Sequence, residues 1–250
     1  MSSRLDAELV SRGICETRNR AQTSIAAGNV TINGIICMKA SRQVSADDTL
    51  TLTEPLPYVG RGGYKLAYAL AEFKISLAGL RCLDIGASTG GFTDCMLQNH
   101  AASVLAVDVG HDQLADALRT DPRVIVREGT DLRVLPPDTE GLPAAFASCD
   151  VSFISLKQII PLLPALLTAS AQAVLLVKPQ FEAGRQALNK HGVVRDEKTR
   201  QQVLRDIRDF SAQYGFLPLH DCISPIQGGS GNIEYLLHLQ RHQTASEAHL

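Results

Sequence analysis

From residue 61 onward, predicted strands alternate with predicted helices along almost the whole chain. Seven short, mostly apolar segments are candidate strands, at 81–86, 103–110, 123–128, 145–153, 173–179, 216–224 and 232–240. Helical stretches such as 197–215 separate most of them. This alternation favours a mostly parallel sheet with helices on both faces. The last two strands have only the short connection 226–231 between them, so we expect them to pair antiparallel.

The first 53 residues follow another pattern, which predicts a small separate domain. Apolar residues at helical spacing predict one helix near 4–13 and a second near 17–29, for which Thr17 is a suitable N-cap. Asn33-Gly34 lies between alternating apolar residues and is a strong hairpin signal. Two short helices and a small sheet are therefore expected here.

These patterns predict the domain organisation. An α+β domain at 1–53 is followed by a linker at 54–62 that is rich in proline and glycine. An α/β domain with a doubly wound, Rossmann-like sheet of seven strands occupies 63–242, and 243–250 form a tail. A chain of 250 residues, 45% of them hydrophobic, is long enough to bury the cores of two such domains.

Composition excludes several classes of protein. The net charge is −2, so any binding of nucleic acid must use local basic patches. Six scattered cysteines without a CxxC pair predict reduced thiols in the cytoplasm rather than disulfides or a zinc site, and no ligand cluster suggests another metal. The first residues do not have the apolar segment of a signal peptide, and no apolar run approaches the roughly 20 residues that span a bilayer.

The loop after the first strand of the α/β domain has the composition of a ligand-binding loop. A buried strand ends near Asp84, and small residues lead into a helix: Gly86, Ala87, Ser88, Thr89, Gly90, Gly91 and then Phe92. Glycines let a backbone approach a ligand closely, and a helix N-terminus offers free N–H groups. The spacing is neither the dinucleotide GxGxxG nor a Walker motif. It resembles the S-adenosylmethionine loop of methyltransferases, in which Asp84 would lie near the ammonium of the cofactor.

Two further aspartates could complete a cofactor site. Asp108 ends the next strand, where an acidic residue suits hydrogen bonding to ribose hydroxyls. Asp131 follows the third strand and could contact an adenine amine. The alternative is an ordinary loop at a strand end with solvated aspartates.

A lysine stands where a buried strand ends. The apolar run 174–177 leads into Lys178, and Pro179 then prevents the strand from continuing as a central strand. Asp150 follows a neighbouring predicted strand, and ligands of doubly wound sheets bind at these carboxyl ends. A lysine and an aspartate there are candidate catalytic groups. A lysine acts as a general base only where burial or a second cation favours its neutral form. The alternative is that each charge belongs to a surface salt bridge.

With two further residues these groups occur in the order Lys65, Asp150, Lys178, Glu234, which resembles the Lys-Asp-Lys-Glu tetrad of FtsJ-like ribose 2′-O-methyltransferases. More narrowly, the chain resembles the TlyA family, also called hemolysin A, in the segments RLDAELVSRG, GRGGYKL, CLDIGASTGGFTDCML, DVSFISL, LVKPQFEAG and GNIEY. The resemblance covers nearly the whole chain.

The resemblance implies a fold and an activity. It implies an RNA-binding domain of the ribosomal S-four type joined to a methyltransferase domain, which methylates cytidine 2′-hydroxyls of ribosomal RNA with S-adenosylmethionine and without a metal. Lys178 would be the general base. Lys65 would be the second cation, Asp150 would help to tune the base and hold the ribose, and Glu234 would complete the network.

RNA contacts should depend on the placement of charge, since residues 1–53 hold six Lys and Arg against five Asp and Glu, a net of 6 − 5 = +1. The candidates are Arg4, Arg18, Arg20, Lys39 and Arg61. Arg18 and Arg20 fall at the start of the second predicted helix, whose N-terminus favours phosphate. Any one of these cations could instead lie on a solvated helix face. The segment 182–197, after Lys178, is either a flap that orders on RNA or a solvated loop.

Two other functions compete with the enzyme. One is an RNA-binding factor for ribosome assembly whose methyltransferase fold is not catalytic. The other is a membrane-active hemolysin, as the older family name suggests. A hemolysin needs an export signal or a long apolar or amphipathic element, and the sequence shows neither.

Overall fold

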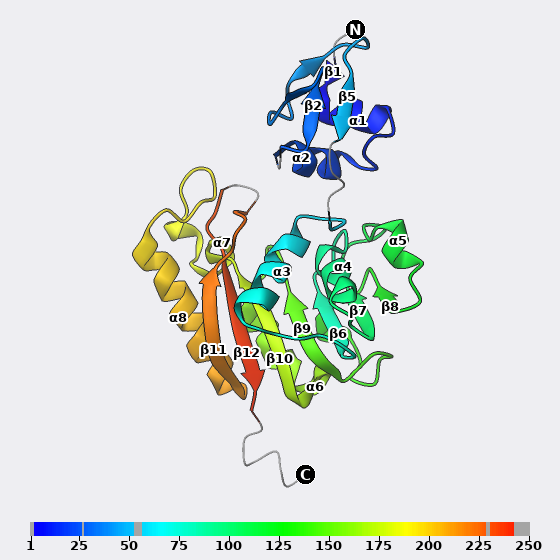
Figure 1. The fold of residues 1–250 in the computed structure, drawn as a ribbon. Coiled ribbons are helices and arrows are strands. Elements are labelled where there is room, and N and C mark those ends of the chain that lie inside the picture. Colours follow the sequence, from blue (N-terminus) through cyan, green and yellow to red (C-terminus); the bar gives the residue numbers. More distant parts are fainter. Residues whose placement is uncertain (1–2, 27, 53–56, 229–230, 243–250) are drawn as a thin grey trace. The chain divides into compact units, whose positions relative to one another are not determined.

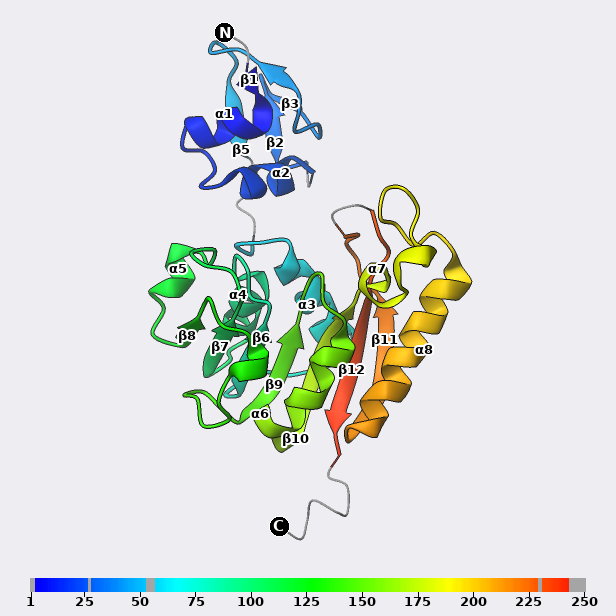
Figure 2. The same ribbon diagram turned by 180° about the vertical axis from the view of Figure 1, so that it is seen from behind.

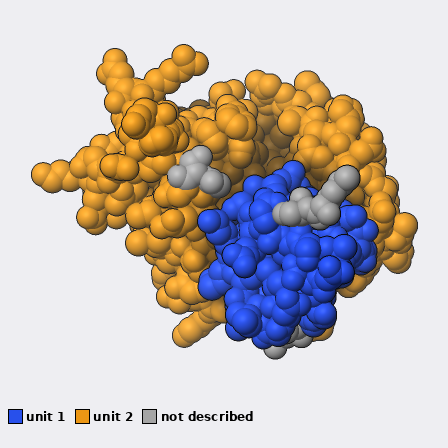
Figure 3. All heavy atoms as spheres, turned by 90° about the horizontal axis from the view of Figure 1, so that it is seen from above, with its two compact units in different colours: residues 1–61 blue, residues 62–250 orange. Residues whose placement is uncertain are grey.

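The structure is a computed structural model of the chain and describes residues 3–26, 28–52, 57–228 and 231–242. The chain divides into two compact units, Met1–Arg61 and Gly62–Leu250, drawn blue and orange in Figure 3. The predicted linker at 54–62 lies partly outside the described residues, and the predicted tail at 243–250 lies entirely outside them.

Unit 1 is a small α+β fold. Its elements are β1 (Ser3–Arg4), α1 (Leu5–Ser11), α2 (Arg18–Ala26), β2 (Val30–Ile32), β3 (Ile35–Ile36), β4 (Gln43–Val44) and β5 (Leu50–Leu52). β2 pairs antiparallel with both β3 and β5, and β1 pairs with β4. The hairpin predicted at Asn33-Gly34 joins β2 to β3, and both residues have the positive φ that such a turn requires. The predicted N-cap is also present, because the Thr17 hydroxyl accepts a hydrogen bond from the Arg20 amide.

Unit 1 has a hydrophobic core of its own. Its two helices and its strands contribute the buried residues Leu5, Leu9, Cys15, Ala21, Ile25, Val30, Val44 and Leu50. This core extends from α1 to β5 within unit 1.

Unit 2 contains the seven-stranded sheet. Its strands are β6 (Arg81–Ile85), β7 (Ser103–Val107), β8 (Val124–Arg127), β9 (Ala144–Cys149), β10 (Leu167–Val177), β11 (Phe216–Ile223) and β12 (Tyr235–Arg241). The strand order is β11-β12-β10-β9-β6-β7-β8. The pairs from β10 through β8 are parallel, whereas β12 pairs antiparallel with both β10 and β11. The predicted fold class and the antiparallel pairing of the last two strands are confirmed.

Helices cover both faces of this sheet. The α-helices are α3 (Gly62–Glu72), α4 (Gly91–Gln98), α5 (Asp116–Arg119), α6 (Leu163–Leu166), α7 (Pro179–Glu182) and α8 (Glu197–Gln213). Short 3₁₀ turns lie at η1 (Leu132–Val134), η2 (Leu156–Gln158), η3 (Ile160–Leu162) and η4 (Arg185–Ala187). Figures 1 and 2 show α3 and α4 on one face and α6 and α8 on the other.

Several predicted strand boundaries were wrong. The strand predicted at 103–110 ends at Val107, the strand predicted at 232–240 starts at Tyr235, and two other strands differ more. The strand predicted to reach residue 153 ends at Cys149, and the following residues form a loop. The strand predicted at 173–179 starts at Leu167 and stops at Val177, where Lys178 precedes the short helix α7. Because β9 ends at Cys149 and β10 at Val177, Asp150 and Lys178 lie in the segments that directly follow these two central strands. The carboxyl ends of the parallel strands meet beside β6. From β6 the chain continues through β7 and β8 on one side and then through β9 and β10 on the other. A ligand site is expected at such a point of a doubly wound sheet.

Candidate active site

The amine of Lys178 lies between two side chains of the loop that follows β9. Lys178 Nζ lies 2.6 Å from Asp150 Oδ1 and donates a hydrogen bond of 2.9 Å to Ser152 Oγ. Lys178 follows the last residue of β10, and Asp150 is fixed by a hydrogen bond from its amide to the Ile85 carbonyl at the end of β6. Neighbouring parallel strands thus bring the amine and the carboxylate together, and the lysine is buried.

Lys65 and Glu234 form a second buried ion pair. Lys65 Nζ, in the first turn of α3, lies 2.7 Å from Glu234 Oε2, directly before β12. Glu234 Oε1 also accepts a hydrogen bond of 3.3 Å from the side-chain nitrogen Nε2 of Gln180, two residues after Lys178. The four predicted catalytic residues therefore form two pairs, Lys178 with Asp150 and Lys65 with Glu234. The alternative interpretation was that these charges form salt bridges at the surface. Both pairs are more buried than such salt bridges are.

The loop after β6 packs directly against the loop that carries Asp150. Gly86 has φ +82°, and a Cβ atom at this position would lie 2.7 Å from the Asp150 carbonyl oxygen. Only glycine combines this backbone conformation with such a close approach. Gly90 has φ +94°, and a Cβ there would overlap the side chains of Leu114 and Leu118. The predicted cofactor loop is thus held close to the Lys178–Asp150 pair.

Asp108 shapes the rest of this loop. Its two carboxylate oxygens accept hydrogen bonds from the amide of Ser88, at 2.8 Å, and from the amide of Gly110, at 2.7 Å. Thr89 accepts a backbone hydrogen bond from Ala115. The neighbouring Val109 is apolar and exposed. A half-buried carboxylate beside an exposed apolar side chain, at the edge of a glycine loop, has the chemistry to hold an adenosine group.

Asp84 and Asp131 are placed differently from the predicted ligand contacts. Asp84 is 0% exposed, and its carboxylate accepts hydrogen bonds from Thr93 Oγ1, at 2.7 Å, and Ser148 Oγ, at 3.0 Å. It therefore supports the loop from inside the protein. Asp131 forms an ion pair with Arg133 and caps η1. The contacts of these two aspartates with an ammonium and an adenine amine remain predictions.

Burial of Asp84 has a consequence for stability. Burial raises the pKa of Asp84 to about 6, although the hydroxyls of Thr93 and Ser148 act in the opposite direction. Between about pH 4 and 6 the unfolded chain has lost this proton while the folded protein retains it, so this group lowers the stability as the pH rises. The cost reaches roughly 3 kcal/mol at neutral pH.

We expect Asp84→Asn to remove this pH dependence. The free energy of unfolding of Asp84→Asn, relative to that of the unmutated protein, should rise by up to roughly 3 kcal/mol between pH 4 and 7. Urea unfolding at four pH values in this range measures the difference. The exposed Asp116, replaced in the same way, is the control. A difference that does not vary with pH for Asp84→Asn would contradict the prediction.

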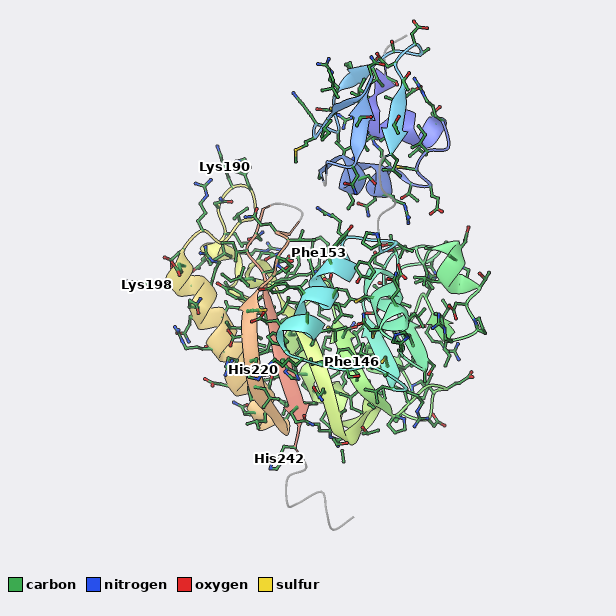
Figure 4. All side chains as sticks on the ribbon, in the orientation of Figure 1. Phe146, Phe153, Lys190, Lys198, His220 and His242 are labelled. Atoms are coloured by element: carbon green, nitrogen blue, oxygen red, sulfur yellow. The ribbon has the colours of Figure 1, made fainter. Side chains whose placement is uncertain are left out.

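The loop after β9 also presents an aromatic residue that the sequence pattern did not indicate. Phe153 is 91% exposed and has φ +64°, which is unusual for a residue other than glycine. Its ring centroid lies 5.1 Å from that of Phe181, and Lys178 Nζ lies 5.8 Å from the Phe181 ring centroid. Figure 4 shows Phe153 at the end of the sheet where the parallel strands terminate. Ser152, Phe153 and Gln180 therefore join the candidate site.

The segment after α7 is partly anchored near this site. Asn232 accepts a hydrogen bond from the Val194 amide, at 3.1 Å, and donates one to the Gly192 carbonyl, at 3.0 Å. The basic side chains of the segment, Arg185, Lys190, His191 and Arg195, are exposed. Lys190 and Lys198 project outward in Figure 4. Its role as an RNA flap remains a prediction.

The predicted RNA-binding residues of unit 1 are all exposed or partly exposed: Arg4, Arg18, Arg20, Lys39 and Arg61. Arg20 lies 4.0 Å from Glu16. Arg4 and Arg18 both contact the buried carboxylate of Asp6. The fold thus leaves these cations accessible, and two of them share one anion.

Comparisons with known proteins agree with the two units. The family described as FtsJ-like methyltransferase matches residues 58–241, and the S4 domain matches residues 3–50. YqxC of Bacillus subtilis, provisionally named an rRNA methyltransferase, is 50% identical over 239 residues, which cover 94% of this chain and 85% of YqxC. The 16S/23S rRNA (cytidine-2′-O)-methyltransferase TlyA of Mycobacterium tuberculosis is 42% identical over 240 residues, which cover 95% of this chain and 90% of TlyA.

A solved structure matches both units. It is a protein of Streptococcus thermophilus, provisionally named a hemolysin, with 46% identity and a TM-score of 0.77 over 97% of this chain and 90% of that one. In the described part of the present chain, no helix is both long and apolar enough to cross a membrane. The same residues contain no group of three or more His, Cys, Asp or Glu side chains that could hold a metal ion.

Proposed function

The chain belongs to the FtsJ-like methyltransferase family, within the TlyA group, and from this premise we propose that it methylates a cytidine ribose 2′-hydroxyl of ribosomal RNA, with S-adenosylmethionine as the methyl donor. The resemblance inferred from the sequence motifs is confirmed. The observation that best supports the chemistry is the buried Lys178 amine held by Asp150 and Ser152 beside the cofactor loop. Ribosomal subunits, present in the cytoplasm, are the proposed partners.

Lys178 is the proposed general base. S-adenosylmethionine, held by the loop at 86–91 and by Asp108, supplies an electrophilic methyl group when bound. In its neutral form the Lys178 amine would accept the proton of the 2′-hydroxyl while that oxygen bonds to the methyl carbon. The bond between this carbon and the donor's sulfur would break, which leaves S-adenosylhomocysteine. Asp150, 2.6 Å from the amine, stabilises the ammonium that forms. Much of the rate comes from holding the two reactants in line, which converts an encounter into a step within one complex.

The Lys65–Glu234 pair is proposed to fix the side of the site that α3 and the start of β12 form. Its two members come from α3 and from the start of β12, so the pair ties one covering helix to the sheet. Gln180 links Glu234 to the short helix that begins directly after Lys178. We assign this pair to positioning Lys178 and the ribose, because neither charge is needed for a second proton transfer.

Phe153 is proposed to stack on an unstacked base of the RNA. Aromatic side chains exposed beside a nucleotide site bind bases in this way, and one stacked base contributes about 1–3 kcal/mol. We therefore expect Phe153→Ala to raise the KM for RNA by roughly 5- to 150-fold. Phe153→Tyr should retain most of the affinity. Because the ring is 91% exposed, neither change should lower the melting temperature appreciably. Steady-state kinetics with varied RNA measures the effect, and an unchanged KM for Phe153→Ala contradicts it.

The experiment that tests the function measures transfer of a labelled methyl group from S-adenosylmethionine to separated small and large ribosomal subunits. Label in RNA, together with one new position that resists alkaline cleavage, establishes 2′-O-methylation and identifies the subunit. If the protein binds a subunit and the cofactor but transfers no label to either subunit or to naked rRNA, the enzyme is rejected for these substrates. The assembly factor is then the better interpretation.

A further inference from the structure

Unit 1 contains a fully buried carboxylate at the start of α1. Asp6 is 0% exposed. Its oxygens accept hydrogen bonds from Arg4 Nε and Nη2, both at 2.9 Å, from Arg18 Nε at 3.0 Å, and from Gln22 Nε2 at 2.8 Å. The amide of Ala7 donates a further hydrogen bond of 3.0 Å. One carboxylate thus joins side chains of β1 and α2.

The charges of this cluster do not cancel. Hydrogen bonds from Arg4, followed by those from Gln22 and Arg18, hold the pKa of Asp6 well below its usual range, so the cluster has one anion and two cations. The side chains of Arg4 and Arg18 remain 42% and 56% exposed. Within the described residues, Arg4 Nη1 and both terminal nitrogens of Arg18 have no hydrogen-bond partner in unit 1. A positive charge and several N–H donors are therefore available at the surface.

We propose that Asp6 is a positioning residue that orients Arg4 and Arg18 as one clamp for the phosphates of the RNA substrate. A guanidinium binds phosphate through its planar fork of donors, so its orientation matters as much as its charge. Holding two long side chains in place before binding reduces the conformational entropy that is lost when the RNA binds. Asp6 itself touches no RNA. This inference rests on the proposed function, since it takes ribosomal RNA as the ligand.

The substitution Asp6→Asn separates positioning from charge. It removes one negative charge, so binding to RNA becomes tighter if the arginines act only as point charges. If Asp6 orients them, binding becomes weaker although the protein is more positive. We expect the KM for the ribosomal subunit that serves as substrate to rise at least about tenfold. This is the effect of losing a hydrogen bond between charged groups. kcat and the Kd of S-adenosylmethionine should not change.

Glu8→Gln is the matched control. Glu8 is on the same helix and accepts hydrogen bonds from Arg12 and Ser3 rather than from the clamp. Its neutralisation changes the net charge equally, and we expect unchanged or slightly tighter binding. In an Arg4→Met/Arg18→Met background, the logarithm of the association constant for RNA should depend less steeply on the logarithm of the salt concentration, by roughly one to two in the slope. Asp6→Asn should then have no further effect.

The outcomes are distinct. If the unmutated protein binds and methylates a subunit while Asp6→Asn binds equally or more tightly, the positioning role is rejected and the proposed function stands. If the unmutated protein methylates no subunit, the proposed function itself fails. Should circular dichroism show that Asp6→Asn unfolds unit 1, Arg18→Lys decides instead, since it keeps the charge and removes the Nε contact with Asp6. Undiminished binding by Arg18→Lys would overturn the proposal.

Discussion

Replacement of Lys178 by methionine should lower kcat for methyl transfer by roughly 10²- to 10⁴-fold, the contribution of a positioned general base. Methionine keeps most of the side-chain volume of the buried lysine and removes the amine that contacts Asp150 and Ser152. Asp150 is partly exposed and can be solvated once its partner is lost. The loop that we propose to bind the cofactor is unchanged, so the Kd of S-adenosylmethionine should stay within a few-fold.

The measurement is single-turnover transfer of a labelled methyl group to the subunit that the unmutated protein modifies. Lys157→Met is the control, because Lys157 is exposed on η2 in the loop region after β9 and contacts the ring of Phe210 instead of the site. A Lys178→Met protein that retained its rate to within threefold would show that another group takes the proton. Our mechanism would then be wrong, although the assignment to the family would stand.

Breaking the Lys65–Glu234 pair should cause the largest loss of stability among our predictions. Glu234→Ala leaves the Lys65 ammonium buried without its partner, and removal of one member of a buried pair costs about 3–5 kcal/mol. The double variant Lys65→Met/Glu234→Leu leaves no unpaired charge. Its stability should return to within about 1–2 kcal/mol of the unmutated protein, or exceed it.

Activity should not follow stability in this series. The double variant is expected to fold and to remain at least tenfold slower in methyl transfer. The reason is that Lys65 and Glu234 are no longer present to position Lys178 and the ribose. Urea unfolding of the unmutated protein, Glu234→Ala and the double variant, together with kcat at saturating substrate, separates the two effects. Arg123→Met, which breaks an exposed pair with Asp121, is the surface control and should cost at most about 1 kcal/mol. A double variant with full activity would show that the pair serves stability alone.

The sequence predicted the sheet well because its signals are local. Short apolar runs located the strands, and apolar residues at helical spacing located the helices between them. The short connection before β12 predicted its antiparallel pairing with β11. The site depended on contacts that no local pattern contains. Lys65 and Glu234 are 169 residues apart in sequence, and their pairing follows from the packing of α3 against the sheet.

Three features could not be found by pattern. The apolar residues around Phe153 continue the strand signal, whereas its positive φ and full exposure depend on the loop conformation after Cys149. Asp84 lies at a strand end, but its direction is set by Thr93 and Ser148, one on α4 and one on β9. Asp6 has the pattern of an ordinary helix residue, and its burial depends on arginines from two other elements.

The place of β12 in the sheet has a consequence for how the protein is made. This strand is the last along the chain among the described residues, yet it lies between β10 and β11, and Glu234 directly precedes it. Chains fold progressively from the N-terminus as they are synthesised, and unit 1 has its own core. In unit 2, by contrast, the edges of β10 and β11 that pair with β12 stay open until β12 has been synthesised and has inserted between them. A growing chain can therefore have a folded unit 1 before its catalytic site is complete, because that site requires β12 to be in place in the sheet.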